Sequence, residues 1–243
     1  MELLCRLRKD FLYIPYTAPH TPYQGPNDNK DKPIPQADYN KGNRKTYIEM
    51  VEQMDEGIGK ILRALQDKQV SDNTLVIFMS DNGANSKGNN SPYSGYKGNL
   101  FEGGIRVPCI VKWPGVIPED VVSNQACITL DFSRSILRAA GTKPPKNRQF
   151  DGIDILRMIE TKQPVQKRIL FWRARRGENT RKAVRDGSLK YIWLQGGDDI
   201  KEYLFDLEKD PAEKNNLLND RDEDLNKLKL LLEDWEEKVK HNR

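Results

Sequence analysis

The chain has 243 residues, of which 37% are apolar, and 40 lysine and arginine residues against 36 acidic ones give it a net charge of +4. This excess is too small and too widely spread for the basic footprint of a nucleic-acid-binding domain. No stretch approaches the ~18 consecutive apolar residues of a membrane-spanning helix. We therefore expect no nucleic-acid and no membrane partner, and enough apolar residues for one sizeable core with or without a smaller domain.

The first part of the chain predicts a strand, a long polar excursion and a helix. An apolar segment at 11–17 predicts a buried strand. The proline-rich residues 22–45 that follow predict a loop. Apolar residues then recur every three or four positions from Tyr47 to Leu65, which predicts an amphipathic helix.

Two further strands and a helix complete an alternating pattern. The unbroken apolar run at 74–79 predicts a strand buried on both faces, as in a parallel sheet covered by helices. Residues 107–113 predict another apolar strand. Residues 130–140 predict a helix that ends at Gly141. This alternation is typical of an α/β domain, which we place at residues 1–141.

The remaining residues, 142–243, predict a small second domain. Short alternating segments separated by glycine-bearing turns predict an antiparallel sheet; they lie at 169–172, 182–185, 190–194 and 202–205. A stripe of leucines with Trp235 predicts a final helix at 220–240 that packs on this sheet. The expected architecture is therefore α/β, with a partial sheet and flanking helices followed by a small antiparallel sheet and a C-terminal helix.

Asp81 and Asn82 are the best candidates for metal ligands. They directly follow the strand at 74–79, and ligands of α/β sheets bind where strands end. Carboxylate and amide oxygens are the donors that Ca²⁺ and Mg²⁺ prefer, but Ca²⁺ takes about 6–8 oxygens and this segment offers two or three. The alternative is that Asn82-Gly83 is a simple turn.

Lys97 and His20 are candidates for anion binding and proton transfer. Lys97 lies in the glycine-rich stretch 96–108, where a lysine beside glycine can bring a point charge close to an anion; a solvated loop lysine is the alternative. His20 lies in a proline-rich loop and could protonate a leaving group or steady an anion. An exposed or structural histidine is the alternative there.

Taken together, these segments resemble the sulfatases of the alkaline phosphatase superfamily. The similar segments occur in family order at 11–22, 47–62, 76–83 and 97–108 followed by Trp113-Pro-Gly, and again at 183–192 and 204–217. The resemblance implies an alkaline-phosphatase-like fold and a sulfuric ester hydrolase. It implies that Asp81 and Asn82 hold Ca²⁺ (or Mg²⁺), that Lys97 contacts the sulfate, and that His20 serves the same site as a general acid.

The family's nucleophile has no counterpart in this sequence. Sulfatases use a formylglycine made from Cys or Ser in a C-x-P-S-R or C-x-A-x-R motif, and its hydrate attacks sulfur. Cys5 is followed by Leu7 and Lys9 where the motif has other residues, and neither Cys109 nor Cys127 fits. The resemblance therefore implies the C-terminal half of a sulfatase, with formylglycine in an N-terminal half that is the possible partner.

Three functions stay open at this stage. The first is hydrolysis of a sulfate ester by the whole protein, with the isolated chain inactive. The second is a phosphoesterase or phosphonate monoester hydrolase of the same superfamily, and the third is a non-catalytic degenerate half. Arg106 is expected to be structural, buried with Glu102 or a backbone partner. The family is often periplasmic, secreted or lysosomal, but no signal peptide is visible at Met1, so the compartment is left open.

Overall fold

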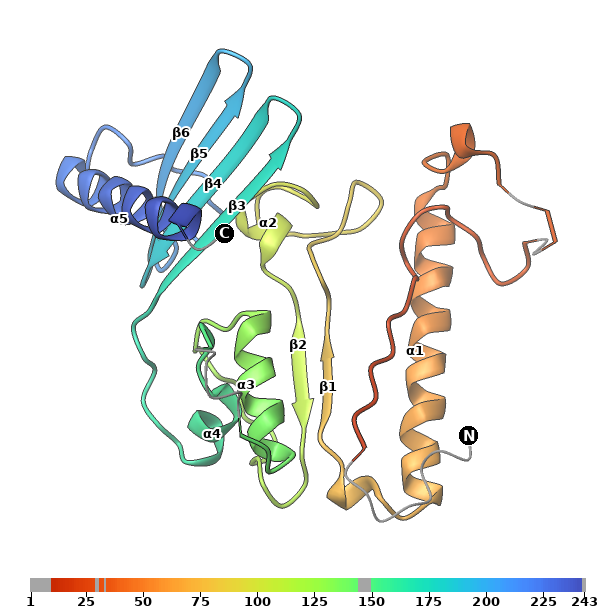
Figure 1. Ribbon diagram of the computed structural model, residues 1–243. Coiled ribbons are helices and arrows are strands. Elements are labelled where there is room, and N and C mark those ends of the chain that lie inside the picture. Colours follow the sequence, from red (N-terminus) through yellow and green to blue (C-terminus); the bar gives the residue numbers. More distant parts are fainter. Residues whose placement is uncertain (1–9, 29–30, 33, 144–149, 242–243) are drawn as a thin grey trace. The chain divides into compact units, whose positions relative to one another are not determined.

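The computed structural model describes residues 10–28, 31–32, 34–143 and 150–241 (Figure 1). The chain divides into two compact units, Met1–Ile77 with Ile110–Val165 and Phe78–Cys109 with Gln166–Arg243. Together they contain the α/β elements and the antiparallel sheet that the sequence predicts, which confirms the fold class. The division at residue 141 stays a prediction.

The first unit contains the long helix α1, Arg44–Asp67. It begins at Asn43, whose side chain accepts a hydrogen bond from the Thr46 amide at 2.9 Å and so satisfies one free N–H of the first turn. The predicted apolar face from Tyr47 to Leu65 is buried or half-buried along its whole length. Short 3₁₀ turns lie before and after α1, at Gln36–Asp38 and Ser71–Asn73.

The predicted buried strand at 11–17 is wrong. Residues 10–17 have extended backbone but form no strand, and Phe11, Leu12 and Tyr13 are 70%, 66% and 76% exposed. A strand is stabilised by hydrogen bonds to a neighbouring strand, and no described strand pairs with this segment. It packs instead beside α1, with the Tyr16 hydroxyl next to Gly57 (Figure 1).

Two short strands, β1 (Val76–Met79) and β2 (Cys109–Lys112), pair with each other. β1 is half-buried along its length rather than buried on both faces, and β2 is largely exposed, with Ile110 at 63%. The position of β1 agrees with the apolar run in the sequence. The burial of β1 does not agree with the prediction, because only one other strand pairs with β1 in the part of the chain that is described.

The rest of the first unit is a pair of helices, α3 (Thr129–Ala139) and α4 (Ile155–Glu160). Buried polar groups join them: Asp131 accepts a hydrogen bond from the Ile153 amide at 2.8 Å, and Ser135 donates to Asp154 at 2.9 Å. Arg138 adds an ion pair with Asp154 at 2.7 Å. These contacts connect the predicted helix at 130–140 to α4.

The second unit contains a four-stranded antiparallel sheet in the order β3-β4-β5-β6. The strands are Ile169–Arg176, Asn179–Asp186, Leu189–Gly196 and Asp199–Asp206. The turns between them contain Gly177, Gly187 and Gly197 with φ of 58–64°, a left-handed conformation that glycine adopts without steric cost. The sequence therefore predicted both the strands and their turns.

The two faces of this sheet are covered by different elements. Helix α5 (Asp222–His241) packs on one face through Leu228 and Leu232, as predicted (Figure 1). The other face packs against Leu100 and Phe101, next to the single-turn helix α2 (Glu102–Ile105). Among the helices in the described ranges, none has the length and apolar character required to cross a membrane.

Candidate functional site

The loop that follows β1 contains three of the four predicted site residues. Asp81 is exposed and Asn82 is half-buried. The side-chain amide of Asn82 donates a hydrogen bond to the Asp81 carboxylate, so the two side chains are in contact. The Ser80 hydroxyl donates to the Asn82 carbonyl at 2.9 Å and helps to hold the turn.

Backbone hydrogen bonds close this loop and bring Lys97 back toward the pair. The Lys97 amide donates to the Ala84 carbonyl at 3.0 Å, two residues beyond Asn82. The Gly83 amide donates to the Gly104 carbonyl at 2.9 Å. A Cβ at Gly103 would lie 2.5 Å from the Ser94 carbonyl oxygen, so only glycine allows this close approach. The structure therefore places Asp81, Asn82 and the Lys97 backbone in one tied loop.

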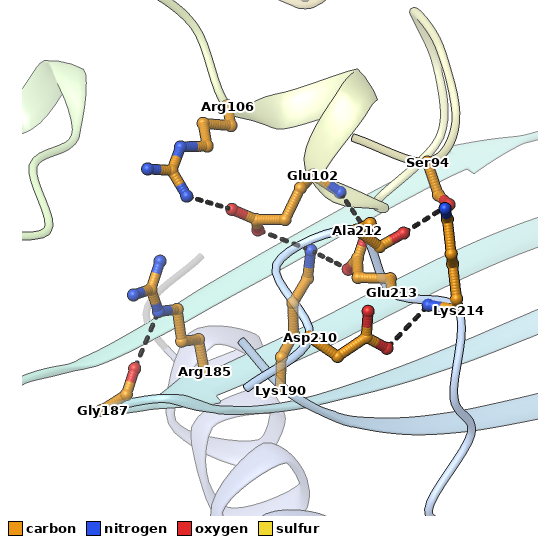
Figure 2. A network of polar contacts seen from close by, with 10 residues as sticks. All are labelled: Ser94, Glu102, Arg106, Arg185, Gly187, Lys190, Asp210, Ala212, Glu213 and Lys214. Atoms are coloured by element: carbon orange, nitrogen blue, oxygen red, sulfur yellow. Dashed lines mark hydrogen bonds and ion pairs between the residues drawn. The ribbon is translucent and has the colours of Figure 1, made fainter. Parts of the chain in front are cut away.

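A buried ion cluster attaches the end of this loop to the antiparallel sheet (Figure 2). The Lys190 ammonium group donates to Glu102 at 2.9 Å and to Glu213 at 2.8 Å. Lys190 is fully buried, and Glu102 and Glu213 are 2% and 5% exposed. The Glu102 amide also donates to the Glu213 carboxylate at 2.5 Å, and the Ser94 hydroxyl donates to the Ala212 carbonyl at 2.6 Å.

The cluster holds one cation between two carboxylates. Burial raises the pKa of Glu213 above its ordinary value, although the Lys190 charge acts in the opposite direction. Arg106 supplies a second positive charge at 3.6 Å from Glu102, and its guanidinium group lies 4.7 Å from the centre of the Tyr93 ring. The expected pairing of Arg106 with Glu102 is confirmed, but the Arg106 side chain is half exposed rather than buried.

A second contact reaches the loop next to Lys97. Arg181 of β4 donates a hydrogen bond to the carbonyl of Gly98. The loop is thus tied on both sides of Lys97, through Ser94 to the segment between β6 and α5 and through Gly98 to β4.

His20 belongs to the first compact unit, whereas Asp81, Asn82 and Lys97 belong to the second. The His20 side chain is exposed, and its Nδ1 atom lies 2.8 Å from the Thr21 carbonyl oxygen. The His20 amide donates to the Thr17 carbonyl at 2.8 Å. Its role beside Lys97 stays a prediction.

The oxygen atoms of Asp81 and Asn82 are of the type that Ca²⁺ or Mg²⁺ prefers, but they supply two or three ligands against the roughly six that such ions need. Within the described residues, no group of three or more His, Cys, Asp or Glu side chains could hold a metal. The residues fit part of a site, and the remaining ligands must come from elsewhere. No described cysteine lies in this loop, and Cys5 is outside the described residues.

Sequence reasoning did not assign roles to Lys190, Glu213 or Arg181. Lys190 could have been found from the period-2 pattern of its strand, because it shares a face with the apolar residue Ile192. A charged residue on a core-facing position needs a buried partner of opposite charge. That pattern does not say which carboxylate is the partner, since Glu102 and Glu213 are distant in the sequence.

Two family profiles match the chain. The sulfatase profile matches residues 6–142, and the profile of the C-terminal region of N-sulphoglucosamine sulphohydrolase matches residues 96–240. The two matches overlap across Lys97 and the Glu102 segment. Together they cover almost the whole chain.

Individual relatives support the same assignment. The chain is 34% identical to N-acetylgalactosamine-6-sulfatase of Canis lupus familiaris over 80% of its own length and 37% of the relative. It is 36% identical to a sulfatase of Formosa agariphila over 67% of its length and 32% of the relative. The crystal structure of Ps i-CgsB superposes with a TM-score of 0.76 at 30% identity, covering 90% of this chain and 48% of that one. The chain thus spans less than half the length of these proteins, and it belongs to the sulfatase family.

Proposed function

We propose that this chain is the C-terminal portion of a formylglycine-dependent sulfuric ester hydrolase. The observation that carries the proposal is the tied loop that contains Asp81, Asn82 and Lys97 in the second unit. Oxygen ligands that can hold a divalent cation, together with a lysine, are groups that bind an anionic ester and stabilise its developing charge. The share of the relatives that is matched, 37% for the canine protein, supports the view that other parts of the site are supplied outside this sequence.

The residues have distinct roles in this proposal. Lys97 places its ammonium group against a sulfate oxygen and stabilises the charge that develops on the leaving oxygen. Asp81 and Asn82 hold the divalent cation, which when bound withdraws charge from the sulfate oxygens. His20 donates a proton to the leaving group. The cysteines of this sequence do not fit a formylglycine motif, so no nucleophilic step is assigned to the chain.

The names of the relatives favour a sulfated sugar as the substrate. The canine relative is named for N-acetylgalactosamine 6-sulfate, and the Ps i-CgsB protein also crystallised in complex with k-i-k-neocarrahexaose. We extend the carbohydrate class to this chain, without choosing a particular sugar. A phosphate or phosphonate ester is the alternative, since the same lysine and a divalent cation would also bind a phosphoryl group.

The first experiment measures hydrolysis of p-nitrophenyl sulfate by the purified chain. We expect no turnover, because the chain carries no matching nucleophile. Sustained hydrolysis that disappears in Lys97→Ala but persists in Lys209→Ala, an exposed lysine outside the loop, would contradict this part of the proposal.

The second experiment restores a nucleophile. The N-terminal half of the Formosa agariphila sulfatase is fused ahead of this chain and produced with a formylglycine-generating enzyme. We expect sulfate release that Lys97→Ala lowers by about a hundredfold or more, whereas Lys209→Ala leaves it unchanged. A folded, formylglycine-bearing fusion that cleaves only p-nitrophenyl phosphate would favour the phosphoesterase. One that cleaves neither ester would favour the degenerate half.

A further inference from the structure

The sheet face that contacts the Lys97 loop also presents cations and aromatic rings at its hairpin end. Cross-strand pairs define this face. Ala174 of β3 lies opposite Arg181 of β4, and Arg176 lies opposite Asn179. On the next strands, Leu194 lies opposite both Arg181 and Lys201. Residues that face each other across strands share a side of the sheet, so Arg176, Arg181 and Lys201 point to one face.

Trp172 and Tyr203 lie on the same face, one row closer to the core. They pair with Ala183 and Ile192, and both rings are half-buried against the Leu100 cluster. We call the set of Trp172, Arg176, Arg181, Lys201 and Tyr203 the basic face.

The cations of the basic face are only weakly engaged. Arg176 is exposed and has no ionic partner in the described part of the chain. Arg181 donates to the Gly98 carbonyl, which leaves its positive charge unneutralised. Lys201 forms an exposed pair with Asp199 at 3.4 Å, and such pairs contribute little. Glu178 in the turn between β3 and β4, and Asp198 and Asp199 at the turn between β5 and β6, are the acidic residues nearby in sequence.

On the opposite face of the same sheet, two cations near the core are paired with an acidic residue of α5. Arg173 and Lys182 both contact Glu236 of α5, at 3.3 and 2.6 Å. Lys182 also lies 4.6 Å from the centre of the Trp193 ring. Arg175 points to this face too and contacts only the Gly177 carbonyl among the described residues. On the side where Lys97 and its loop lie, Arg176 and Arg181 both lack an ionic partner within the described residues.

From these contacts we infer that the basic face binds a second anionic group of a sulfated oligosaccharide whose reacting sulfate lies at Lys97. Arginine and lysine bind sulfate oxygens through charge-assisted hydrogen bonds. Exposed edges of Trp172 and Tyr203 offer apolar surface to the sugar ring. Arg181 connects the two places directly, because the carbonyl that it contacts belongs to the residue after Lys97. The inference rests on the proposed function and narrows its substrate class to multiply sulfated chains.

The test is calorimetric binding to the full chain, which does not depend on turnover. The probes are sulfated neocarrahexaose, the same hexasaccharide after desulfation, and galactose 6-sulfate. We expect Arg176→Ala and Lys201→Ala together to weaken binding of the sulfated hexasaccharide about tenfold or more, because each substitution removes a charge-assisted contact. Galactose 6-sulfate should bind these variants as it binds the original chain.

Arg175→Ala is the matched control. Arg175 neighbours Arg176 on the same exposed strand end but points to the other face, because alternate residues of a strand do. Its removal should leave binding of the sulfated hexasaccharide unchanged, and binding should weaken as salt rises because the contacts are exposed. An equal loss in Arg175→Ala, or equal binding of the desulfated hexasaccharide, would overturn the inference. Thermal melts of each variant check that the second unit is intact.

Lys97→Ala separates this inference from the proposed function. If Lys97→Ala weakens the binding of galactose 6-sulfate and of the sulfated hexasaccharide alike, the sulfate site at Lys97 is supported. If Lys97→Ala changes the binding of neither probe while Arg176→Ala and Lys201→Ala weaken binding of the hexasaccharide, the inference about the basic face is supported and the proposed reaction site at Lys97 is contradicted. If the basic-face variants leave binding of both probes unchanged while Lys97→Ala weakens it, the inference is contradicted and the proposed function is still supported. Absence of measurable binding of the sulfated hexasaccharide to the original chain would also overturn the inference.

Discussion

Lys190 and Glu213 form an ion pair of 2.8 Å in which neither side chain is accessible to solvent. Glu102 completes the cluster from the end of the loop that contains Lys97. A buried ion pair adds little net stability compared with a well-packed apolar pair, but removing one partner leaves a buried charge uncompensated. Lys190 is therefore the buried cation that balances both carboxylates at this attachment of the loop to the sheet.

Replacing Lys190 with Met should strongly destabilise the second unit. Glu213 would then lie buried without a cation and Glu102 would keep only Arg106 at 3.6 Å, so we expect a loss of about 3–5 kcal/mol in the free energy of unfolding. Urea unfolding followed by tryptophan fluorescence measures this, since three of the four tryptophans, Trp172, Trp193 and Trp235, lie in that unit.

Two comparisons make this prediction specific. Lys209→Met removes an exposed lysine from the same unit and should change the stability by less than about 0.5 kcal/mol. Adding Glu102→Gln and Glu213→Gln to Lys190→Met should recover part of the loss, because no buried carboxylate remains. An unchanged unfolding midpoint in Lys190→Met would show that the cluster does not hold the loop.

Asp186 should give the second unit a stability that is lost in acid. Burial alone would raise the pKa of Asp186, but hydrogen bonds from Lys227 at 2.6 Å and Lys167 at 3.2 Å outweigh it and hold the pKa below its ordinary value. A lowered carboxyl pKa stabilises the folded state above the unfolded pKa, near 4, and the contribution disappears as pH falls through the folded pKa.

Asp186→Asn should therefore cost about 1–3 kcal/mol at pH 7 and progressively less below pH 4. Urea unfolding of both proteins between pH 7 and pH 2.5 measures the difference. Using the difference removes the effect of Glu213, whose raised pKa acts in the opposite direction in both proteins. Asp199→Asn is the exposed control, and a cost that stays constant with pH would be inconsistent with the Asp186 contacts.

Ca²⁺ should bind weakly at Asp81 and Asn82. The two side chains supply two or three of the about 6–8 ligands that Ca²⁺ takes. We therefore expect a dissociation constant weaker than about 0.1 mM, because even the weakest sites with a full set of ligands bind Ca²⁺ about that tightly. Calorimetry with the full chain measures it, with Asp199→Ala as a control. Sub-micromolar binding that survives Asp81→Ala would show that the ligand assignment is wrong.

The chain on its own should self-associate. Phe11, Leu12 and Tyr13 expose two thirds or more of their surface, and Ile110 of β2 is 63% exposed. Contiguous exposed apolar side chains and an unpaired strand edge both promote association. Light scattering after size-exclusion chromatography should show species larger than 28.0 kDa that decrease when Phe11, Leu12 and Tyr13 are changed to Ser. A monodisperse monomer at high concentration would contradict this expectation.

The local elements were predictable because their signals lie within a few residues. The spacing of apolar residues predicted α1 and α5, and the glycine-bearing turns predicted the four strands of the sheet. The segment at 11–17 shows the limit of this reasoning. Its apolar residues match a strand, but strand formation depends on a partner, and none pairs with it among the described residues.

The sequence by itself determined the family, the helices and strands, and the position of Asp81, Asn82 and Lys97 in one glycine-rich loop. Only the tertiary structure decided which residues hold that loop. Glu102, Lys190 and Glu213 are far apart along the chain. They come into contact because the loop packs on one face of the sheet within the same unit. The tertiary structure also decided that Arg176 and Arg181 share the face that touches Gly98. The register between paired strands fixes the face to which each side chain points, and that register is set by the pairing of the strands.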